Sequence, residues 1–470
     1  MNNISLYLGI TALIINYIFF IIYITQLRLS SRDVTEVNKN KKLLEDNILD
    51  FNQLISSRNN LELTVVIPAY NEQETICKSV SSFLSQRYDN LKIYVVNDGS
   101  KDNTKRECLD YFHMEKIPLF KQQSDIFTQP VKEIYQSQDY PNIYLIDKEN
   151  GGKSDALNVG VNYATSDYVA FVDADSFVEE DALVTLMSPF YFSDDIVSIG
   201  GQIRPMTRIE NFSKRSVKIR TTKILPSFQY LEYLRSVLVF RSSLSKIEST
   251  VIISGAFGVY DITILREIDG LDTDSIGEDF DLTLSIRKHL NDRKIDKRQI
   301  FLYDSVCWTQ PPSRIRDVVK QRSRWQIGFL QTVWKHKGMV FNRRYKNVGM
   351  VGLPLFIFTE FVSFLMETVG LVLGGYFLAT GIISWREAIY IFLLSYFVNL
   401  FFTMAVILQN ARIQNISYKD KLFLMCLGLV EAFSYHWVSL YSKFKGTVKF
   451  LFTGKKAKHD WGDIKRDEVV

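Results

Sequence analysis

Acidic, basic and aromatic residues that could bind a phosphorylated ligand stand at the ends of apolar segments in the middle of this chain. In chain order they are Glu72, Asp98, Lys153, Asp155, Asp173, Asp175, Glu278, Asp279, Gln321, Arg324 and Trp325. No single one of them identifies a reaction. Their order and spacing favour group transfer from a diphosphate, with a divalent metal ion to balance its charge.

The carboxylates of Asp173 and Asp175 carry the strongest signal. Alternate side chains of a strand share a face, so both could converge on one Mg2+ or Mn2+ ion that bridges diphosphate oxygens. The alternative is an acidic turn in which Ser176 caps the following helix. Because burying two carboxylates without a cation is costly, we favour the metal interpretation.

Other candidates precede the metal pair along the chain. Glu72 and Asp98 each follow an apolar strand pattern and could accept hydrogen bonds from a base or ribose, or simply form a capping turn. Lys153 follows two glycines and could meet a phosphate at a helix start, although a solvated lysine explains the same pattern. Asp155 could contact the nucleotide or stabilise the first helical turn.

The remaining candidates follow the metal pair. Glu278 and Asp279 precede an amphipathic helical pattern, where a carboxylate could act as a general base or as an N-cap. Gln321, Arg324 and Trp325 belong to a basic, aromatic helical stretch that could hold a diphosphate and stack on a sugar. The alternative for that stretch is a plain membrane-interface anchor.

Five short apolar runs that end in polar turns predict the strands that position these residues. They are Leu63–Glu72, Leu91–Ser100, Asn142–Gly152, Asp167–Ser176 and Val197–Arg204. Helical patterns at Glu72–Gln86, Ser154–Tyr163 and Glu179–Ser188 lie between them, which predicts βαβ units and a mostly parallel sheet buried on both faces. Ligands of such sheets bind at the carboxyl ends of the strands.

Apolar runs at both ends of the chain predict membrane helices. Ile4–Tyr23 is uncharged and long enough to cross a bilayer, and the basic residues that follow it predict a cytoplasmic middle region. Further runs lie at Val348–Ile383, Ala388–Leu408 and Leu422–Leu440. If the basic tail is cytoplasmic like the middle region, the chain must cross the membrane an even number of times between the two. The simplest count of these later runs gives three spans.

Composition excludes some other functions. A formal net charge of +4 with no basic stripe argues against a nucleic-acid partner. The four cysteines are scattered without a CxxC pair, so neither a disulfide framework nor a zinc site is predicted.

Taken together, these residues resemble the processive, inverting family 2 glycosyltransferases, which include cellulose, chitin, hyaluronan and poly-N-acetylglucosamine synthases. The likeness runs from about Thr64 to Trp325 and into the flanking apolar segments. The family's separated D, DxD, ED and QxxRW elements occur here in order, as Asp98, Asp173 with Asp175, Glu278-Asp279 and Gln321–Trp325. The resemblance implies a cytosolic active site and an adjoining transmembrane channel for the polymer.

The resemblance also implies roles for the candidates. Asp98 and Asp155 would contact uridine, Asp173 and Asp175 would position the metal and diphosphate, and Asp279 would be the catalytic base beside Glu278. Gln321, Arg324 and Trp325 would hold the leaving pyrophosphate and the acceptor. Glu72 and Lys153 join the expected substrate-binding set on their local sequence patterns alone. The chain departs from many members at Gly277, where they have Thr, which leaves the placement of the acceptor open.

We therefore expect an α/β fold, with a GT-A domain (the nucleotide-diphospho-sugar transferase fold, with a Rossmann-like mixed sheet) inserted between transmembrane helices. The expected parts are an N-terminal transmembrane helix (1–27), a cytosolic connector (28–60), the catalytic domain (61–310), an interfacial amphipathic segment (311–346), a C-terminal transmembrane region (347–445) and a cytosolic basic tail (446–470).

The expected function is transfer of a hexose or N-acetylhexosamine from a UDP-sugar to the end of a growing polysaccharide at the plasma membrane. Expected partners are the UDP-sugar donor, the polysaccharide acceptor, the lipid bilayer and a secretion or accessory subunit. Two alternatives stay open. One is a non-processive transferase that glycosylates a polyprenyl phosphate or other lipid, and the other is a transporter or structural membrane protein with a nucleotide-binding module.

Overall fold

The predicted strands all form. The structure, a computed structural model, describes residues 3–46, 61–206, 224–413 and 416–453. The five strands expected from apolar runs are confirmed as β1 (Leu63–Ala69), β2 (Leu91–Asp98), β5 (Ile143–Lys148), β6 (Tyr168–Val172) and β8 (Ile196–Pro205).

Five further strands complete one ten-stranded sheet of order β3-β4-β5-β2-β1-β6-β9-β8-β10-β7. They are β3 (Met114–Ile117), β4 (Val131–Ser137), β7 (Ser176–Val178), β9 (Phe257–Asp261) and β10 (Arg298–Thr309). The neighbours β5, β2, β1 and β6 run parallel, as do β8 and β10, and the other pairs are antiparallel. The expected mixed sheet is therefore confirmed, and the mostly parallel arrangement expected from the βαβ pattern holds only at the centre, because hairpin partners such as β4 and β5 need only a short turn between them.

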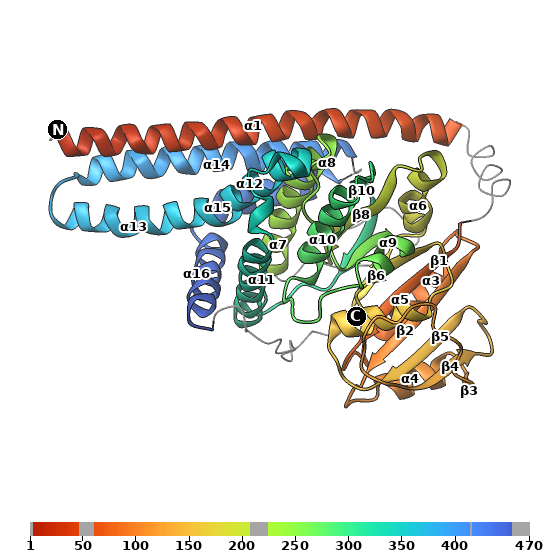
Figure 1. Ribbon diagram of the computed structural model, residues 1–470. Helices are drawn as coiled ribbons and strands as arrows, with labels where there is room; N and C mark the ends of the chain where they lie inside the picture. Colours follow the sequence, from red (N-terminus) through yellow and green to blue (C-terminus); the bar gives the residue numbers. More distant parts are fainter. Residues whose placement is uncertain (1–2, 47–60, 207–223, 414–415, 454–470) are drawn as a thin grey trace.

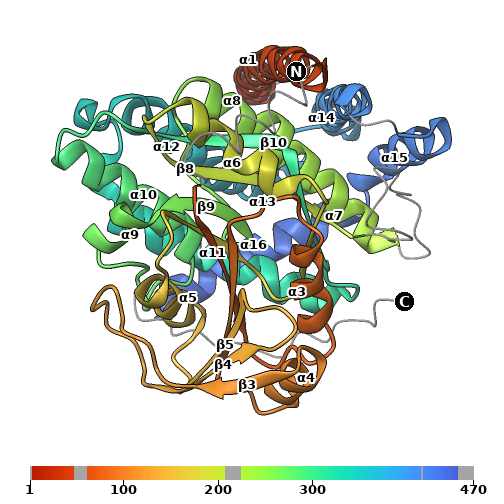
Figure 2. The same ribbon diagram turned by 90° about the vertical axis from the view of Figure 1, so that its right-hand side faces the viewer.

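Helices cover both faces of the parallel centre (Figure 2). Every residue of β1 is buried. Val65 and Ile67 belong to a core shared with α3 (Ile76–Leu84), α4 (Thr104–Tyr111) and α6 (Ala182–Phe192). Val66 belongs to the core on the opposite face, formed with α5 (Lys153–Tyr163), α9 (Ile262–Glu267) and α10 (Glu278–Asp292). Burial on both faces explains why the central strands read as continuous apolar runs.

The C-terminal half of the chain is helical. After α1 (Asn3–Asp46), the remaining helices are α7 (Ile224–Arg235), α8 (Ser242–Lys246), α11 (Ile315–Lys335), α12 (Leu353–Ile357), α13 (Ser363–Ala379), α14 (Trp385–Ile413), α15 (Tyr418–Glu431) and α16 (Tyr435–Thr453). Short π or 3-10 segments join them at η1 (Ser236–Arg241), η2 (Lys337–Met339), η3 (Arg343–Tyr345), η4 (Val348–Gly352) and η5 (Phe358–Val362).

Among the described residues, Leu13–Arg32 within α1, Val348–Ala379 and Trp385–Ile413 are long and apolar enough to cross a membrane by length and composition. The bent pair of α15 and α16 would count as a fourth span if the two helices form one span. The apolar run predicted at Leu422–Leu440 is broken instead, because α15 and α16 meet at a bend of 56°. Figure 1 shows α1, α13 and α14 running along one direction, whereas α16 runs across it beside α11.

Candidate active site

A buried ammonium joins two of the predicted site residues. Asp98 ends β2, and its register partner on β5 is Lys148. The Lys148 Nζ atom is fully buried and lies 2.6 Å from Asp98 Oδ1 and 2.6 Å from Asp155 Oδ1. The Asp98 carboxylate also accepts hydrogen bonds from the backbone N–H groups of Gly151 (2.9 Å) and Gly152 (2.8 Å). Asp98 therefore anchors the turn before α5 and does not cap the helix that follows β2.

The glycine turn places Lys153 in the centre of the site. Gly152 has a φ of +93°, which favours glycine, and a Cβ at Gly151 would lie 2.5 Å from the Asp155 Cγ atom. Lys153 is the first residue of α5, and its Nζ atom lies 2.6 Å from Asp173 Oδ1 and 3.0 Å from Glu278 Oε1. One lysine thus joins carboxylates that are about a hundred residues apart in the chain.

The Asp173–Asp175 segment is a turn, which corrects the expected geometry. β6 ends at Val172 and β7 begins at Ser176, so the two carboxylates do not share a strand face. They remain close enough to interact: burial, opposed by Lys153, and the neighbouring charge of Asp175 raise the pKa of Asp173. Asp173 is half-buried and Asp175 is buried, and the one ammonium near them, that of Lys153, is shared with Glu278. Two neighbouring carboxylates in such a setting could accept a further cation.

Glu278 and Asp279 begin α10 as predicted, but their environments differ. Burial of Glu278 opposes ionisation, yet the positive charges of Lys153 and Arg324 outweigh it and hold the pKa of Glu278 below its usual value. Burial and the charge of Glu278 raise the pKa of Asp279, although Lys153 and the Gly255 N–H, 3.2 Å from its Oδ2 atom, oppose this. A helix N-terminus alone would stabilise the anion. The raised pKa instead makes Asp279 a stronger base than an ordinary aspartate, which suits a group that accepts a proton.

Gly255 completes this centre without adding a side chain. A Cβ there would lie 3.3 Å from the Asp279 Cβ atom and 3.4 Å from the Lys153 Nζ atom. The glycine therefore lets the chain before β9 approach the acidic pair closely.

The three predicted residues of α11 lie next to a fourth, Arg322. Arg322 is buried, donates to Gln321 Oε1 (2.9 Å) and pairs with Glu232 Oε2 (2.7 Å). Its guanidinium lies 4.0 Å from the centre of the Trp325 ring. Trp325 is 42% exposed. Its exposed ring remains free to stack on a ligand.

The predicted residues thus fall into groups. Lys153, Asp173 and Glu278 are in contact, with Asp279 beside them and Arg324 near enough to shift the pKa of Glu278. The second group is Asp98 and Asp155 around Lys148. Glu72 stands apart, where its Oε2 atom accepts a hydrogen bond from the Thr75 hydroxyl (2.9 Å) at the start of α3.

Sequence reasoning missed Lys148, Glu232 and Arg322 as site residues. The sequence did hold a signal for Lys148. It ends one apolar strand and Asp98 ends another, and opposite charges at the ends of neighbouring strands can form a cross-strand ion pair. Glu232 gave no signal, because it lies 90 residues from its partner Arg322.

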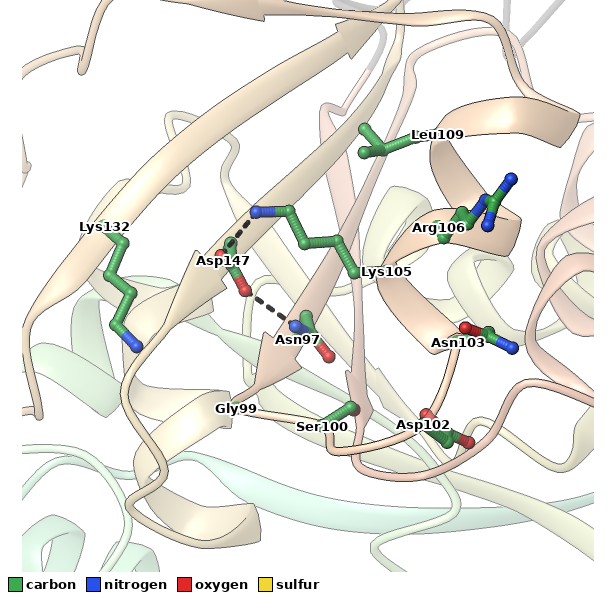
Figure 3. Close-up of a pocket in the computed structure, with 10 residues that line it drawn as sticks. All are labelled: Asn97, Gly99, Ser100, Asp102, Asn103, Lys105, Arg106, Leu109, Lys132 and Asp147. Atoms are coloured by element: carbon green, nitrogen blue, oxygen red, sulfur yellow. Dashed lines mark hydrogen bonds and ion pairs between the residues drawn. The ribbon is translucent and has the colours of Figure 1, made fainter.

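A pocket of about 400 Å3 lies at the same sheet edge on the α4 side (Figure 3). Asn97 and Asp147 line it, joined by a hydrogen bond of 2.7 Å, and Lys105 lies 2.8 Å from Asp147. None of the predicted site residues lines this pocket. Side chains alternate along β2, so Asn97 faces α4 while Asp98 faces α5.

Family models match most of the described chain. A model of glycosyl transferase family 2 matches residues 64–243, and one of glycosyl transferase family group 2 matches residues 168–408. The second match alone covers more than half of the 470 residues.

Similar proteins of known name are poly-beta-1,6-N-acetyl-D-glucosamine synthases. The chain is 29% identical to that of Staphylococcus aureus (strain COL) over 57% of its own length and 54% of the relative. It is 28% identical to that of Staphylococcus epidermidis over 66% of each. The matched part thus spans about half of the S. aureus relative.

Solved structures resemble the chain more weakly. A mannosyltransferase from Pyrobaculum calidifontis, in complex with GDP-Man and Mn2+, has a TM-score of 0.49 and 17% identity over 91% of this chain and 99% of its own. TarS 1–349 of S. aureus in complex with UDP has a TM-score of 0.37 and 14% identity over 87% of this chain and 96% of its own. The family matches, with the mixed sheet and its acidic edge, carry the assignment: this chain belongs to glycosyl transferase family 2 and is a glycosyltransferase of the GT-A fold.

Proposed function

We propose that this protein is a membrane-bound, inverting β-glycosyltransferase that transfers a hexose or N-acetylhexosamine from a UDP-sugar to the end of a growing polysaccharide, coupled to export. The observation that carries the proposal is the contact of Lys153 with both Asp173 and Glu278, with Asp279 next in the chain. This contact joins the acidic turn expected to hold a diphosphate to the helix that begins with the expected base.

Inversion requires one direct displacement at the anomeric carbon. In the proposed step, Asp279 takes the proton of an acceptor hydroxyl while the oxygen of that hydroxyl bonds to the anomeric carbon. The bond between that carbon and the diphosphate oxygen breaks, and its electron pair leaves with UDP. Lys153 and Arg324 hold the negative charge of the leaving group. Asp98 and Asp155, fixed by Lys148, form the uridine side of the site, with Glu72 at the adjacent strand end.

Asp173 and Asp175 fit a Mg2+ or Mn2+ ion. No cluster of three or more His, Cys, Asp or Glu side chains suited to a metal occurs among the described residues. Two carboxylates are nevertheless sufficient, because Mg2+ is commonly held by one or two carboxylates together with substrate phosphates and water. Such an ion would neutralise charge on the diphosphate leaving group. Burial and the nearby charge of Asp175 raise the pKa of Asp173, and a cation between the two carboxylates would offset that repulsion.

Two observations support a polysaccharide acceptor. The relatives are named as synthases of a poly-N-acetylglucosamine, which favours UDP-N-acetylglucosamine as donor. In addition, the exposed ring of Trp325, held by Arg322, offers a stacking surface for an acceptor sugar. Gln321, which accepts a hydrogen bond from Arg322, lies on the same helix.

The test is transfer by the purified protein. Detergent-solubilised protein is incubated with radiolabelled UDP-N-acetylglucosamine, UDP-glucose and other UDP-sugars, with Mg2+, Mn2+ or a chelator, and the product is sized. We expect a long polymer from one donor and no product with the chelator. A single sugar on a lipid would support the lipid-directed alternative. Binding of UDP without sugar transfer from any donor would overturn the proposal in favour of a nucleotide-binding membrane protein.

A further inference from the structure

The last described helix, α16, packs along α11 over much of its length (Figure 1). At its start, the Tyr435 hydroxyl donates to Glu232 Oε2 (2.6 Å), the atom that also pairs with Arg322 of α11. Further along, Ser323 donates to the Ser442 carbonyl (3.0 Å). α16 is therefore fastened to the helix that carries Gln321, Arg324 and Trp325.

The middle of α16 leaves no space between the two helices. A Cβ at Gly446 would lie 2.7 Å from the Ser323 carbonyl oxygen and 2.7 Å from the Gln326 Cβ atom. Gln326 also donates to the Thr447 hydroxyl (3.2 Å). Since one of the close atoms belongs to the backbone of α11, a side chain at position 446 would have to push the helices apart.

α11 in turn presses on the residues that begin α10. A Cβ at Gly328 would lie 2.7 Å from the Gly277 nitrogen, and a Cβ at Gly277 would lie 3.1 Å from the Gly328 carbonyl carbon. Phe450 of α16 packs against Ile276 and Ile327, which flank this contact. Glu278 and Asp279 follow Gly277 directly, so the contacts run without interruption from α16 to the proposed base.

We propose that α16 is a positioning element of the active site: by holding α11 against Gly277, it fixes Asp279 relative to Lys153 and Arg324. This inference rests on the proposed function, because it assigns Asp279 the role of base. It also gives a reason for Gly277, where many of the resembling enzymes have Thr. The backbone of Gly328 occupies the space that a larger residue would need.

The same contacts separate α16 from the candidate spans. α15 and α16 bend by 56° where they meet, and α16 crosses the direction of α13 and α14 (Figure 1). Two candidate spans, Val348–Ala379 and Trp385–Ile413, then lie between the catalytic region and α16. That even number agrees with a basic tail on the catalytic side.

The experiment compares Gly446→Leu with Lys445→Leu in the full-length protein. Both add leucine to the same turn of α16, but Gly446 is buried against α11 whereas Lys445 is exposed. The measurements are UDP affinity, kcat and donor KM, and the pH dependence of kcat. Charged and titratable neighbours of Asp279 are Glu278 on α10, Lys153 on α5, Arg241 at the end of η1 and Tyr260 on β9.

For Gly446→Leu we expect unchanged UDP affinity and donor KM, with kcat lower by about tenfold to a hundredfold, as a small displacement of a reacting group produces. The acid limb of kcat should also move to lower pH, because separating α10 from α11 hydrates Asp279 and lowers its pKa. Lys445→Leu should match the wild type.

Three results would count against the inference. The first is a wild-type kcat for Gly446→Leu. The second is a kcat of Gly446→Leu that falls equally at every pH, because that result indicates only a loss of folded protein. The third is an effect of Lys445→Leu as large as that of Gly446→Leu. If Gly446→Leu yields no folded protein, Gly328→Ala provides the same test from the α11 side. A wild-type protein that transfers no sugar would instead refute the proposed function.

Discussion

At the scale of single residues, the site separates two adjacent acids by their surroundings. Glu278 faces Lys153 and Arg324 and is held as an anion, whereas half-buried Asp279 lies beside that anion, and desolvation and the charge of Glu278 raise its pKa. Two neighbouring carboxyl groups with opposed pKa shifts are a common arrangement for acid–base chemistry. The proposed division is that Glu278 holds Lys153 in place and Asp279 receives the proton.

Asp279→Asn tests the base. The amide cannot accept a proton, so kcat should fall by about 10²-fold to 10⁴-fold, the usual contribution of general base catalysis. UDP affinity should stay within about twofold of the wild type, because uridine is expected at Asp98 and Asp155. Radiolabelled sugar transfer and calorimetric UDP binding measure the two effects. Asp274→Asn in the exposed loop before α10 is the control and should be silent. Turnover that survives in Asp279→Asn would mean that another group is the base.

Glu278→Gln tests the electrostatics. Asp279 accepts a proton only when ionised, so the rate rises as the pH rises through its pKa. The Glu278 charge raises that pKa, so the amide should lower it and move the acid limb of the pH–rate profile to lower pH. Glu115→Gln at an exposed position is the matched control. An acid limb that stays in place or moves to higher pH would show that Glu278 does not set the pKa of the base.

At the scale of elements, β2 and β5 are joined at their ends by the pair Asp98–Lys148, with Asp155 on the other side of the ammonium. Lys148→Met removes the ammonium and leaves two buried carboxylates without it. Breaking a buried ion pair in this way costs about 3–5 kcal/mol. We expect a large fall in the unfolding temperature in detergent, together with weaker UDP binding.

Lys92→Met is the matched control for Lys148→Met. Lys92 lies on β2, next to the strand that carries Lys148, and pairs with Glu62. Both side chains of this pair are at least one-third exposed. Its loss should cost below about 1 kcal/mol, as for other surface ion pairs. Equal destabilisation by the two variants would show that the buried triad has no special role in joining the strands.

The elements also show how far sequence reasoning reaches. The central strands were predictable because residues such as Val65, Val66 and Ile67 are buried on both faces, which produces an uninterrupted apolar run. β3 and β4 escaped prediction because they lie at the sheet edge and carry half-exposed, mixed residues. The local contact of Gly277 with Gly328 depends on helix packing, which no local pattern encodes.

Site residues were predictable in type more than in geometry. The order of Asp98, Asp173, Glu278 and Arg324 identified the resemblance, because the first three stand at the ends of regular elements and Arg324 belongs to a short motif within a helix. Their partners were not predictable, since Lys153 meets Asp173 and Glu278 only after the chain has folded. Buried cations such as Lys148 look like surface lysines until the register of their strand is known.

At the scale of the whole molecule, the bend between α15 and α16 favours an even number of spans after the catalytic region, where the simplest count from the sequence was three. The apolar run Leu422–Leu440 divides between α15 and α16. Ser442 and Gly446 of α16 contact α11, which carries part of the proposed site. Two candidate spans then remain between α11 and α16. The turn at residues 380–384 should therefore lie on the opposite side of the membrane from the catalytic domain, and α16 on the same side.

Cysteine labelling in intact cells tests this topology. The four native cysteines are first replaced by alanine, because Cys426 is exposed. Single cysteines then replace Thr380 in the turn, Thr273 in the catalytic domain and Lys445 on α16, all at exposed positions. A membrane-impermeant maleimide should label only the position-380 variant in intact cells, and all three after permeabilisation, because the reagent reaches only the outer side until the bilayer is opened. Labelling of the position-445 variant in intact cells would mean that α16 lies on the outer side of the membrane. In that case its contacts with α11 could not support the catalytic centre in the way proposed.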